Sequence, residues 1–192
     1  MQSILYHHHP PTQMIKSELF ADYRIEYEEQ ADLCHRHLLT GKYTNTSDAI
    51  AGRQYLLGNE DVFIAVVNPT EKMDYFYRNG DGDELLFVHH GTGTIETLFG
   101  TLTYRPGDYV VIPIGTIYRV LPDIGRSKFL VIESTSWIST PKRYRNDHGQ
   151  LLEHSPFCER DLKAPEVLET HTEIGEYEVR TKSRGYLHSH IY

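Results

Sequence analysis

The feature that most constrains the fold is a series of short apolar segments separated by turns between residues 54 and 137. Within this series, apolar and polar residues alternate with a period of two, which is typical of β-strands, and glycine or proline separates one segment from the next. Short strands at this spacing indicate an all-β barrel or sandwich. From residue 54 onward, the strands are expected over residues 61–67, 73–78, 84–90, 94–98, 100–104, 109–113, 117–120 and 128–133.

The flanking segments are less regular. In residues 16–39, Leu33, His37 and Leu38 could share one helical face, whereas residues 23–27 alternate like a strand, and both interpretations stay open. After residue 137 the pattern loosens until two segments near the end, an alternating strand over 176–182 and an apolar, aromatic stretch over 186–192. We therefore divide the chain into three parts: an amino-terminal arm with strands (1–53), a barrel core (54–137) and a carboxy-terminal extension (138–192).

The composition bears on partners and location. The net charge of −8 argues against a nucleic-acid partner, and we interpret the basic residues 142–145 as a solvated loop. No apolar run approaches the roughly 18 residues that a membrane span requires, so we expect no membrane partner. Two cysteines, Cys34 and Cys158, are too few for a disulfide scaffold, which makes a cytoplasmic location the expectation.

The turn residues resemble the two motifs of the cupins, which are small jelly-roll barrels. In the first motif a glutamate is followed by six residues and a glycine, as Glu84 is followed by Gly91. In the second motif a glycine is followed by five residues and Pro-x-Gly, as Gly107 is followed by Pro113 and Gly115. The resemblance implies a cupin-type jelly-roll barrel, here with extended amino- and carboxy-terminal arms.

The metal-binding positions of these motifs do not match. Cupins hold a divalent metal with two histidines, a glutamate and a third histidine, ligands that suit iron, manganese or zinc. The histidine pair should fall within residues 77–80, which read Tyr-Arg-Asn-Gly, and the third histidine at Tyr118, while the motif's asparagine falls at Pro122. Only Glu84 remains. We therefore expect a metal-free barrel with no catalytic, cofactor-binding or metal-binding residue of its own.

Other histidines are weaker candidates. His89 and His90 are adjacent on a strand, so only one of them can face the barrel interior, and a lone inward histidine is more often a hydrogen-bonded core residue than a ligand. Histidines near the two ends could bind a metal ion, but no carboxylate partner can be placed beside them. These are His7, His8 and His9, together with His188 and His190, which would share one face of a strand.

Longer runs resemble the homogentisate 1,2-dioxygenases of tyrosine breakdown. Residues 74–88 resemble their FYNSDGD segment, and further similar stretches make the resemblance cover nearly the whole chain. Those stretches are residues 5–12, 144–146, 149–156 and 158–161. The resemblance implies a two-cupin, oligomeric (trimeric or hexameric), ring-cleaving enzyme. It also implies that the Fe(II), its two histidines and one glutamate, and the histidine base belong to the carboxy-terminal cupin, outside residues 1–192.

The expected role follows from that division. We expect this chain to be the inactive amino-terminal half, without a cofactor, giving structure and oligomer contacts and pairing with a second cupin half. One alternative is a stand-alone metal-free cupin that binds a small ligand at a barrel mouth lined by Tyr104, Tyr109 and Tyr118, although core and rim positions are favoured for these tyrosines. The other is an independent cupin enzyme, which needs at least three convergent ligands that we cannot assemble from the sequence.

Overall fold

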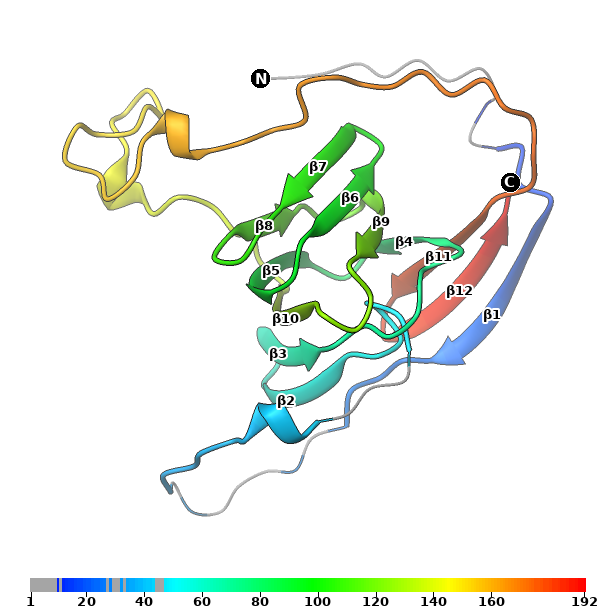
Figure 1. Cartoon of the computed structure of the whole chain (residues 1–192), viewed down its shortest axis with the longest axis horizontal. Helices are drawn as coiled ribbons and strands as arrows, with labels where there is room; N and C mark the ends of the chain where they lie inside the picture. Colours follow the sequence, from blue (N-terminus) through cyan, green and yellow to red (C-terminus); the bar gives the residue numbers. More distant parts are fainter. Residues whose placement is uncertain (1–9, 11, 27, 29–31, 33, 44–46) are drawn as a thin grey trace.

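The computed structural model describes residues 10, 12–26, 28, 32, 34–43 and 47–192, and in this part the chain forms two facing β-sheets and no α-helix (Figure 1). The seven-stranded sheet contains, in spatial order, β1 (Lys16–Asp22), β12 (Tyr186–Ile191), β11 (Glu178–Ser183), β4 (Phe76–Asn79), β9 (Ile117–Pro122), β6 (Gly93–Thr97) and β7 (Gly100–Tyr104). The five-stranded sheet contains β2 (Gln54–Gly58), β3 (Val62–Val67), β10 (Lys128–Ser134), β5 (Asp83–His90) and β8 (Tyr109–Ile112). Three short 3-10 helices complete the inventory: η1 (Thr40–Lys42), η2 (Lys142–Tyr144) and η3 (Glu159–Asp161).

This arrangement confirms the all-β, cupin-type jelly-roll barrel with extended arms. Neighbouring strands are antiparallel except for β11 and β4, which run parallel. The chain between β10 and β11 leaves the barrel, passes through η2 and η3, and returns along the outside to β11 (Figure 1). The segments before and after the barrel core supply β1, β11 and β12, which extend one sheet beyond β4.

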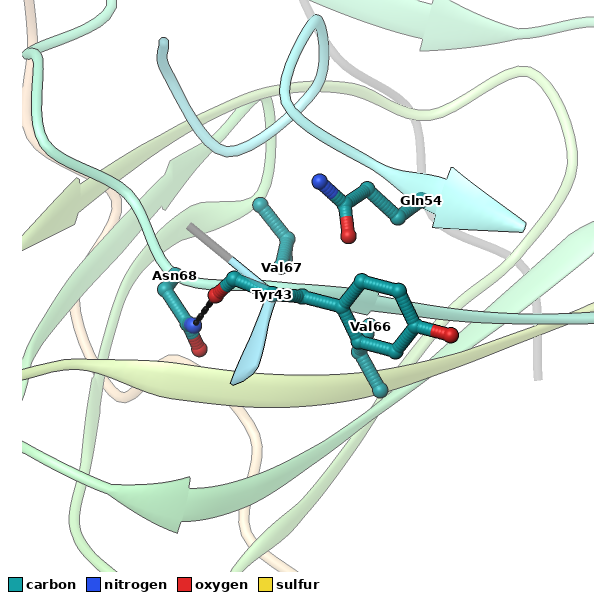
Figure 2. Close-up of a pocket in the computed structure, with 5 residues that line it drawn as sticks. All are labelled: Tyr43, Gln54, Val66, Val67 and Asn68. Atoms are coloured by element: carbon teal, nitrogen blue, oxygen red, sulfur yellow. Dashed lines mark hydrogen bonds between the residues drawn. The ribbon is translucent and has the colours of Figure 1, made fainter. Parts of the chain in front are cut away.

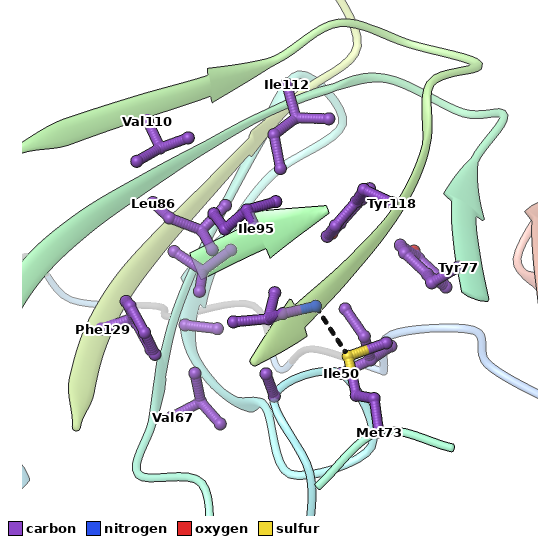
Figure 3. Packing of buried hydrophobic residues seen from close by; sticks show 14 of the residues in the cluster. Ile50, Val67, Met73, Tyr77, Leu86, Ile95, Val110, Ile112, Tyr118 and Phe129 are labelled. Carbon is purple, nitrogen blue, oxygen red and sulfur yellow. Dashed lines mark hydrogen bonds between the residues drawn. The ribbon is translucent and has the colours of Figure 1, made fainter. Parts of the chain in front are cut away.

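The core lies between the two sheets (Figure 3). It forms because alternate residues of each strand point inward, as β5 illustrates with Leu86 and Val88 buried between more exposed neighbours. The largest fully buried apolar side chains are Tyr77, Tyr118, Phe129, Ile50, Leu86, Ile95, Val67, Val88, Val120 and Val131.

The motif glycines occupy positions that favour glycine. Gly91, Gly107 and Gly115 have φ angles of +83°, +93° and +80°, a region that residues with a side chain rarely adopt. At Gly91 a Cβ atom would also lie 2.6 Å from the Cα atom of Ser127. The turns expected from the motif spacing are therefore present, and the backbone conformation explains why glycine stands there.

Two expectations about strands need correction. The strand expected over 73–78 begins only at Phe76, and Met73 belongs to the loop before it, where its Sδ accepts a hydrogen bond from the Val120 amide at 3.4 Å (Figure 3). The strand suspected over 23–27 lies earlier, at β1, which pairs with β12. Because six of the seven β1 residues are exposed, its sequence lacks the alternation that marks a half-buried strand. His37 and Leu38 are exposed and lie outside any helix, and Leu33 lies outside the described residues.

No helix in the described part of the chain is long and apolar enough to cross a membrane. The two cysteines are both free thiols, Cys34 exposed and Cys158 partly buried. The basic segment 142–145 forms the short helix η2 and the residue that follows it. The Arg143 guanidinium lies 4.6 Å from the centroid of the Tyr144 ring.

Candidate functional site

Three residues at metal-ligand positions of the cupin motifs, Tyr77, Glu84 and Tyr118, lie close together inside the barrel. Tyr77 on β4 lies opposite Tyr118 on β9, and their rings meet edge to face with centroids 5.5 Å apart. Glu84 reaches them from β5 in the other sheet, and the side chains of all three residues are fully buried. The positions that correspond to metal ligands in the cupin motifs therefore lie together inside the barrel.

A cation of the chain itself occupies this place. The guanidinium of Arg53 forms a buried ion pair with the Glu84 carboxylate through Nη1 and Oε1, and its Nη2 donates a hydrogen bond of 3.0 Å to the Tyr118 hydroxyl. That hydroxyl in turn donates to Glu84 Oε2 at 2.5 Å, which closes a ring of three side chains. The guanidinium also lies 5.6 Å from the centroid of the Tyr77 ring. We call Arg53, Glu84 and Tyr118 the buried triad.

Arg53 reaches the interior because hydrogen bonds to buried groups hold the turn before β2 in place. The Asp48 carboxylate accepts a hydrogen bond of 2.7 Å from the Ile50 amide and another of 3.0 Å from the Tyr75 hydroxyl. The Arg53 Nε donates to the Ala49 carbonyl at 3.3 Å. Residues 49–52 form a turn, and residues 48–50 are buried.

A second buried ion pair lies beside the triad. Glu133 on β10 stands opposite Glu84 in the register of β10 and β5, and its carboxylate pairs with the ammonium group of Lys182 on β11. Both side chains are about 95% buried or more. Among the buried oxygen atoms without a hydrogen-bond partner in the described residues are Glu133 Oε2 and the hydroxyls of Tyr55, Tyr77 and Tyr104.

Burial and charge set the protonation of the triad. Burial is the largest single influence and opposes the charged form of Arg53, but the Glu84 carboxylate and the nearby tyrosine side chains together outweigh it, so the pKa of Arg53 is raised well above its usual value. Burial, followed by the nearby Glu84 carboxylate, raises the pKa values of Tyr77 and Tyr118 well above the ordinary value of 10. At neutral pH the site therefore contains a charged guanidinium and two neutral phenols.

These residues do not fit a divalent metal. Of the expected ligand set only the Glu84 carboxylate is present, and both of its oxygens already accept hydrogen bonds from Arg53 and Tyr118. Neutral phenols are poor ligands, and a guanidinium at the same place repels a second cation. Over residues 10–192, excluding those that the structure does not describe, no cluster of three or more His, Cys, Asp or Glu side chains could hold a metal ion.

Of the other candidate histidines, the four that the structure describes are exposed or partly buried. Neither His89 nor His90 faces the interior, because both are exposed at the end of β5, where the pairing with β10 shifts register. His188 and His190 do share one face of β12, with stacked rings 6.3 Å apart, as expected for a strand. His7, His8 and His9 lie outside the described residues.

The three tyrosines considered for a barrel mouth lie in different places. Tyr104 is buried against Phe129, and Tyr118 belongs to the buried triad. Tyr109 is 68% exposed on the outer face of β8, where its ring lies 4.8 Å from that of Phe87. They form no common mouth, so this support for the small-ligand alternative is lost.

Two hollows lie at the edge of the five-stranded sheet. One is lined by Tyr43, Gln54, Val66, Val67 and Asn68, and the Asn68 side chain donates to the Tyr43 carbonyl at 3.1 Å across it (Figure 2). The other lies along β2 and β3 and is lined by Leu57, Gly58, Asn59, Val62 and Ile64.

The outer face of the five-stranded sheet carries an uncharged apolar band. Its members alternate with the inward core residues and align across neighbouring strands, as Leu85 aligns with Val111 and Ile132. Three of them are well exposed, Leu57 at 54%, Val111 at 41% and Tyr109 at 68%. We call this set the outer apolar band: Leu57, Ile64, Leu85, Phe87, Tyr109, Val111, Leu130 and Ile132.

Comparison with known proteins yields one family and several relatives. The model of the family described as "Homogentisate 1,2-dioxygenase N-terminal" matches residues 40–190. A protein of Saccharolobus solfataricus named "Putative dioxygenase" is 37% identical over 182 residues, which are 94% of this chain and 47% of that protein. The chain thus spans about half the length of this curated relative.

Solved structures with similar folds include two that the chain covers almost fully. KdgF from Halomonas sp. is 16% identical, with a TM-score of 0.44 over 54% of this chain and 96% of that one. A cupin superfamily protein from Desulfitobacterium hafniense is 19% identical, with a TM-score of 0.43 over 58% of this chain and 97% of that one.

Proposed function

Because the chain belongs to the homogentisate 1,2-dioxygenase N-terminal family, we propose that it is the structural half of an enzyme that opens the ring of homogentisate with O₂. The observation that carries the proposal is the buried triad, in which the Arg53 guanidinium pairs with Glu84, the one residue of the expected ligand set that is present. In this proposal a second cupin half, in the cytoplasm of the same cell, binds the iron and the substrate. The chain described here contributes structure and contacts between subunits.

The outer apolar band supports such a role. A row of aligned, uncharged side chains on a sheet face is the kind of surface that another protein covers. The curated relative is about twice as long as the matched region, so the same family offers a partner of similar size to this chain. We therefore propose that the second cupin half packs against the outer apolar band.

Metal analysis and oxygen uptake test the catalytic part of the proposal. The purified chain should contain no stoichiometric iron after incubation with Fe(II) and should consume no oxygen with homogentisate. Addition of the separately produced second cupin half should restore oxygen uptake. One iron per chain together with turnover by this chain alone would refute the proposal.

Surface variants test the contact. Tyr109→Glu places a charge in the middle of the band and should weaken co-purification with the second half at least tenfold. Thr103→Glu, on an exposed position of β7 in the opposite sheet, is the matched control and should leave co-purification unchanged. Equal binding by both variants would exclude the band as the contact. Self-association of the chain that only Tyr109→Glu abolishes would assign the band to a second copy and contradict the proposed occupant.

A further inference from the structure

We propose that the interior of this barrel is a guanidinium site, in which Arg53 serves as the resident cation where other cupins hold a divalent metal. The inference concerns the chain alone and does not depend on the proposed function. It rests on the place of Arg53 in the barrel, on its ion pair with Glu84 and on the shape of the guanidinium group.

The contacts of Arg53 match those expected of a bound cation. Its guanidinium touches Glu84 from the five-stranded sheet and Tyr118 from the seven-stranded sheet, so it joins the two sheets at the centre of the barrel. The ring of Tyr77 adds a cation–π contact from β4. The arginine side chain is 1% exposed, so these contacts are shielded from bulk solvent.

The charges and hydrogen-bonding groups of the site favour a guanidinium over a divalent metal ion. A carboxylate buried without a partner is costly, which is why Glu84 needs a cation inside the barrel. A guanidinium is planar, stays charged and presents several N–H groups in a fixed fork, so one group can satisfy both the carboxylate and the Tyr118 oxygen. A hard divalent ion would need several more oxygen or nitrogen ligands, and Tyr77 and Tyr118 stand where cupins have histidines.

The origin of the cations adds a second, independent observation. Both buried carboxylates, Glu84 and Glu133, belong to core strands, whereas Arg53 lies at the end of the amino-terminal segment and Lys182 in the carboxy-terminal one. Each flanking segment therefore delivers one cation to the core. The barrel obtains from its own arms the positive charge that a metal supplies elsewhere.

Chemical rescue tests the guanidinium site. The Arg53→Ala variant should unfold at a lower temperature than the unchanged protein, and millimolar methylguanidinium should restore part of the loss because it can enter the vacated place. Methylguanidinium, Mn²⁺, Zn²⁺ and EDTA should leave the unfolding temperature of the unchanged protein as it is. Arg126→Ala, which removes an arginine with an 82% exposed side chain, is the control and should show neither loss nor rescue.

Three results would overturn the proposal. They are a normal unfolding temperature for Arg53→Ala, a loss that methylguanidinium does not reduce, and stoichiometric uptake of a divalent ion by the unchanged protein. If Arg53→Ala does not fold, the pair Arg53→Met and Glu84→Leu replaces it. The double variant, which removes both charges, should then be more stable than Arg53→Met alone, whereas strictly additive losses would contradict the charge pairing.

Discussion

Glu84 and Glu133 lie directly opposite each other on the neighbouring strands β5 and β10, and both carboxylates are buried in the barrel. Two like charges at adjacent positions repel each other unless cations lie close by. Arg53 and Lys182 meet that requirement, one for each carboxylate. These four side chains come from four parts of the chain and form two buried ion pairs next to each other, so the stability of the protein should depend on each of them.

Loss of the Lys182 ammonium should be strongly destabilising. In Lys182→Met the carboxylate of Glu133 stays buried without its cation, and breaking a buried pair in this way costs about 3–5 kcal/mol. The free energy of unfolding can be measured by urea denaturation. Lys128→Met is the matched control, because the ammonium of Lys128 only donates to the Thr40 hydroxyl at 3.1 Å in a partly exposed place. A loss equal to that of the control would show that the Glu133 pair contributes little.

Two tyrosine variants separate hydrogen bonding from packing. Tyr77 and Tyr118 are equally buried and contact each other, but only the Tyr118 hydroxyl is hydrogen-bonded to described residues, Glu84 and Arg53. Tyr118→Phe should therefore lower the free energy of unfolding by about 1–3 kcal/mol, because it leaves buried polar groups without partners. Tyr77→Phe should change it by about 0.5 kcal/mol or less, the size of an effect on packing alone. Equal losses in urea denaturation would contradict the assigned hydrogen bonds.

The same residues show how much of this molecule the sequence predicts. The period-two pattern and the spacing of Gly91, Gly107 and Gly115 identify the barrel, because glycine and proline in turns report directly on local backbone conformation. The spacing also places Tyr118 and Glu84 inside the barrel. Local signals of this kind are available in a single sequence.

The cations of the site could not be found in the same way. Arg53 stands directly before β2, where no local pattern marks it as buried. Lys182 stands in a strand whose alternation gives no sign that a lysine points inward. Their partners are 31 and 49 residues away in the chain, so the pairing depends on tertiary structure. The one available signal was negative: a cupin with Glu84 and without the histidines has a buried carboxylate that needs another cation.

Alkaline pH should destabilise the protein through its buried tyrosines. Burial raises the pKa of Tyr23 and of Tyr104 to about 12, above the ordinary value of 10 that applies after unfolding. A group whose pKa is raised in the folded state contributes stability that is complete below pH 10 and is lost as the pH rises toward 12. The free energy of unfolding should thus fall between pH 10 and 12. Absorbance at 295 nm should show that part of the 14 tyrosines ionise only after unfolding.

Two outcomes decide this prediction. If all tyrosines ionise together near pH 10 while the far-ultraviolet circular dichroism still shows the native sheet, Tyr23 and Tyr104 are not buried as described. Tyr104→Phe should remove one tyrosine from the late phase of the titration and leave the early phase unchanged, because burial raises the pKa of Tyr104 to about 12.

We expect Asp48 to position the Arg53 side chain without a direct hydrogen bond to it. Its carboxylate accepts hydrogen bonds from the Ile50 amide and the Tyr75 hydroxyl. Arg53 follows the same turn, and its side chain extends from there to Glu84. Asp48→Ala leaves both donors buried without an acceptor, which should lower the free energy of unfolding by at least about 1–3 kcal/mol. The Asp123→Ala control removes a carboxylate that is half exposed and lies 3.9 Å from Arg126, so it should cost no more than about 1 kcal/mol.

A double-mutant cycle connects this turn to the triad. If Asp48 fixes the turn that delivers Arg53, the loss caused by Arg53→Met should be smaller when Asp48 is already alanine, because the arginine is then less well placed. A coupling of about 0.5–3 kcal/mol is typical of residues that share one network. Additive losses within 0.3–0.5 kcal/mol, roughly the scatter of independent sites, would instead mean that Arg53 finds Glu84 without help from the turn.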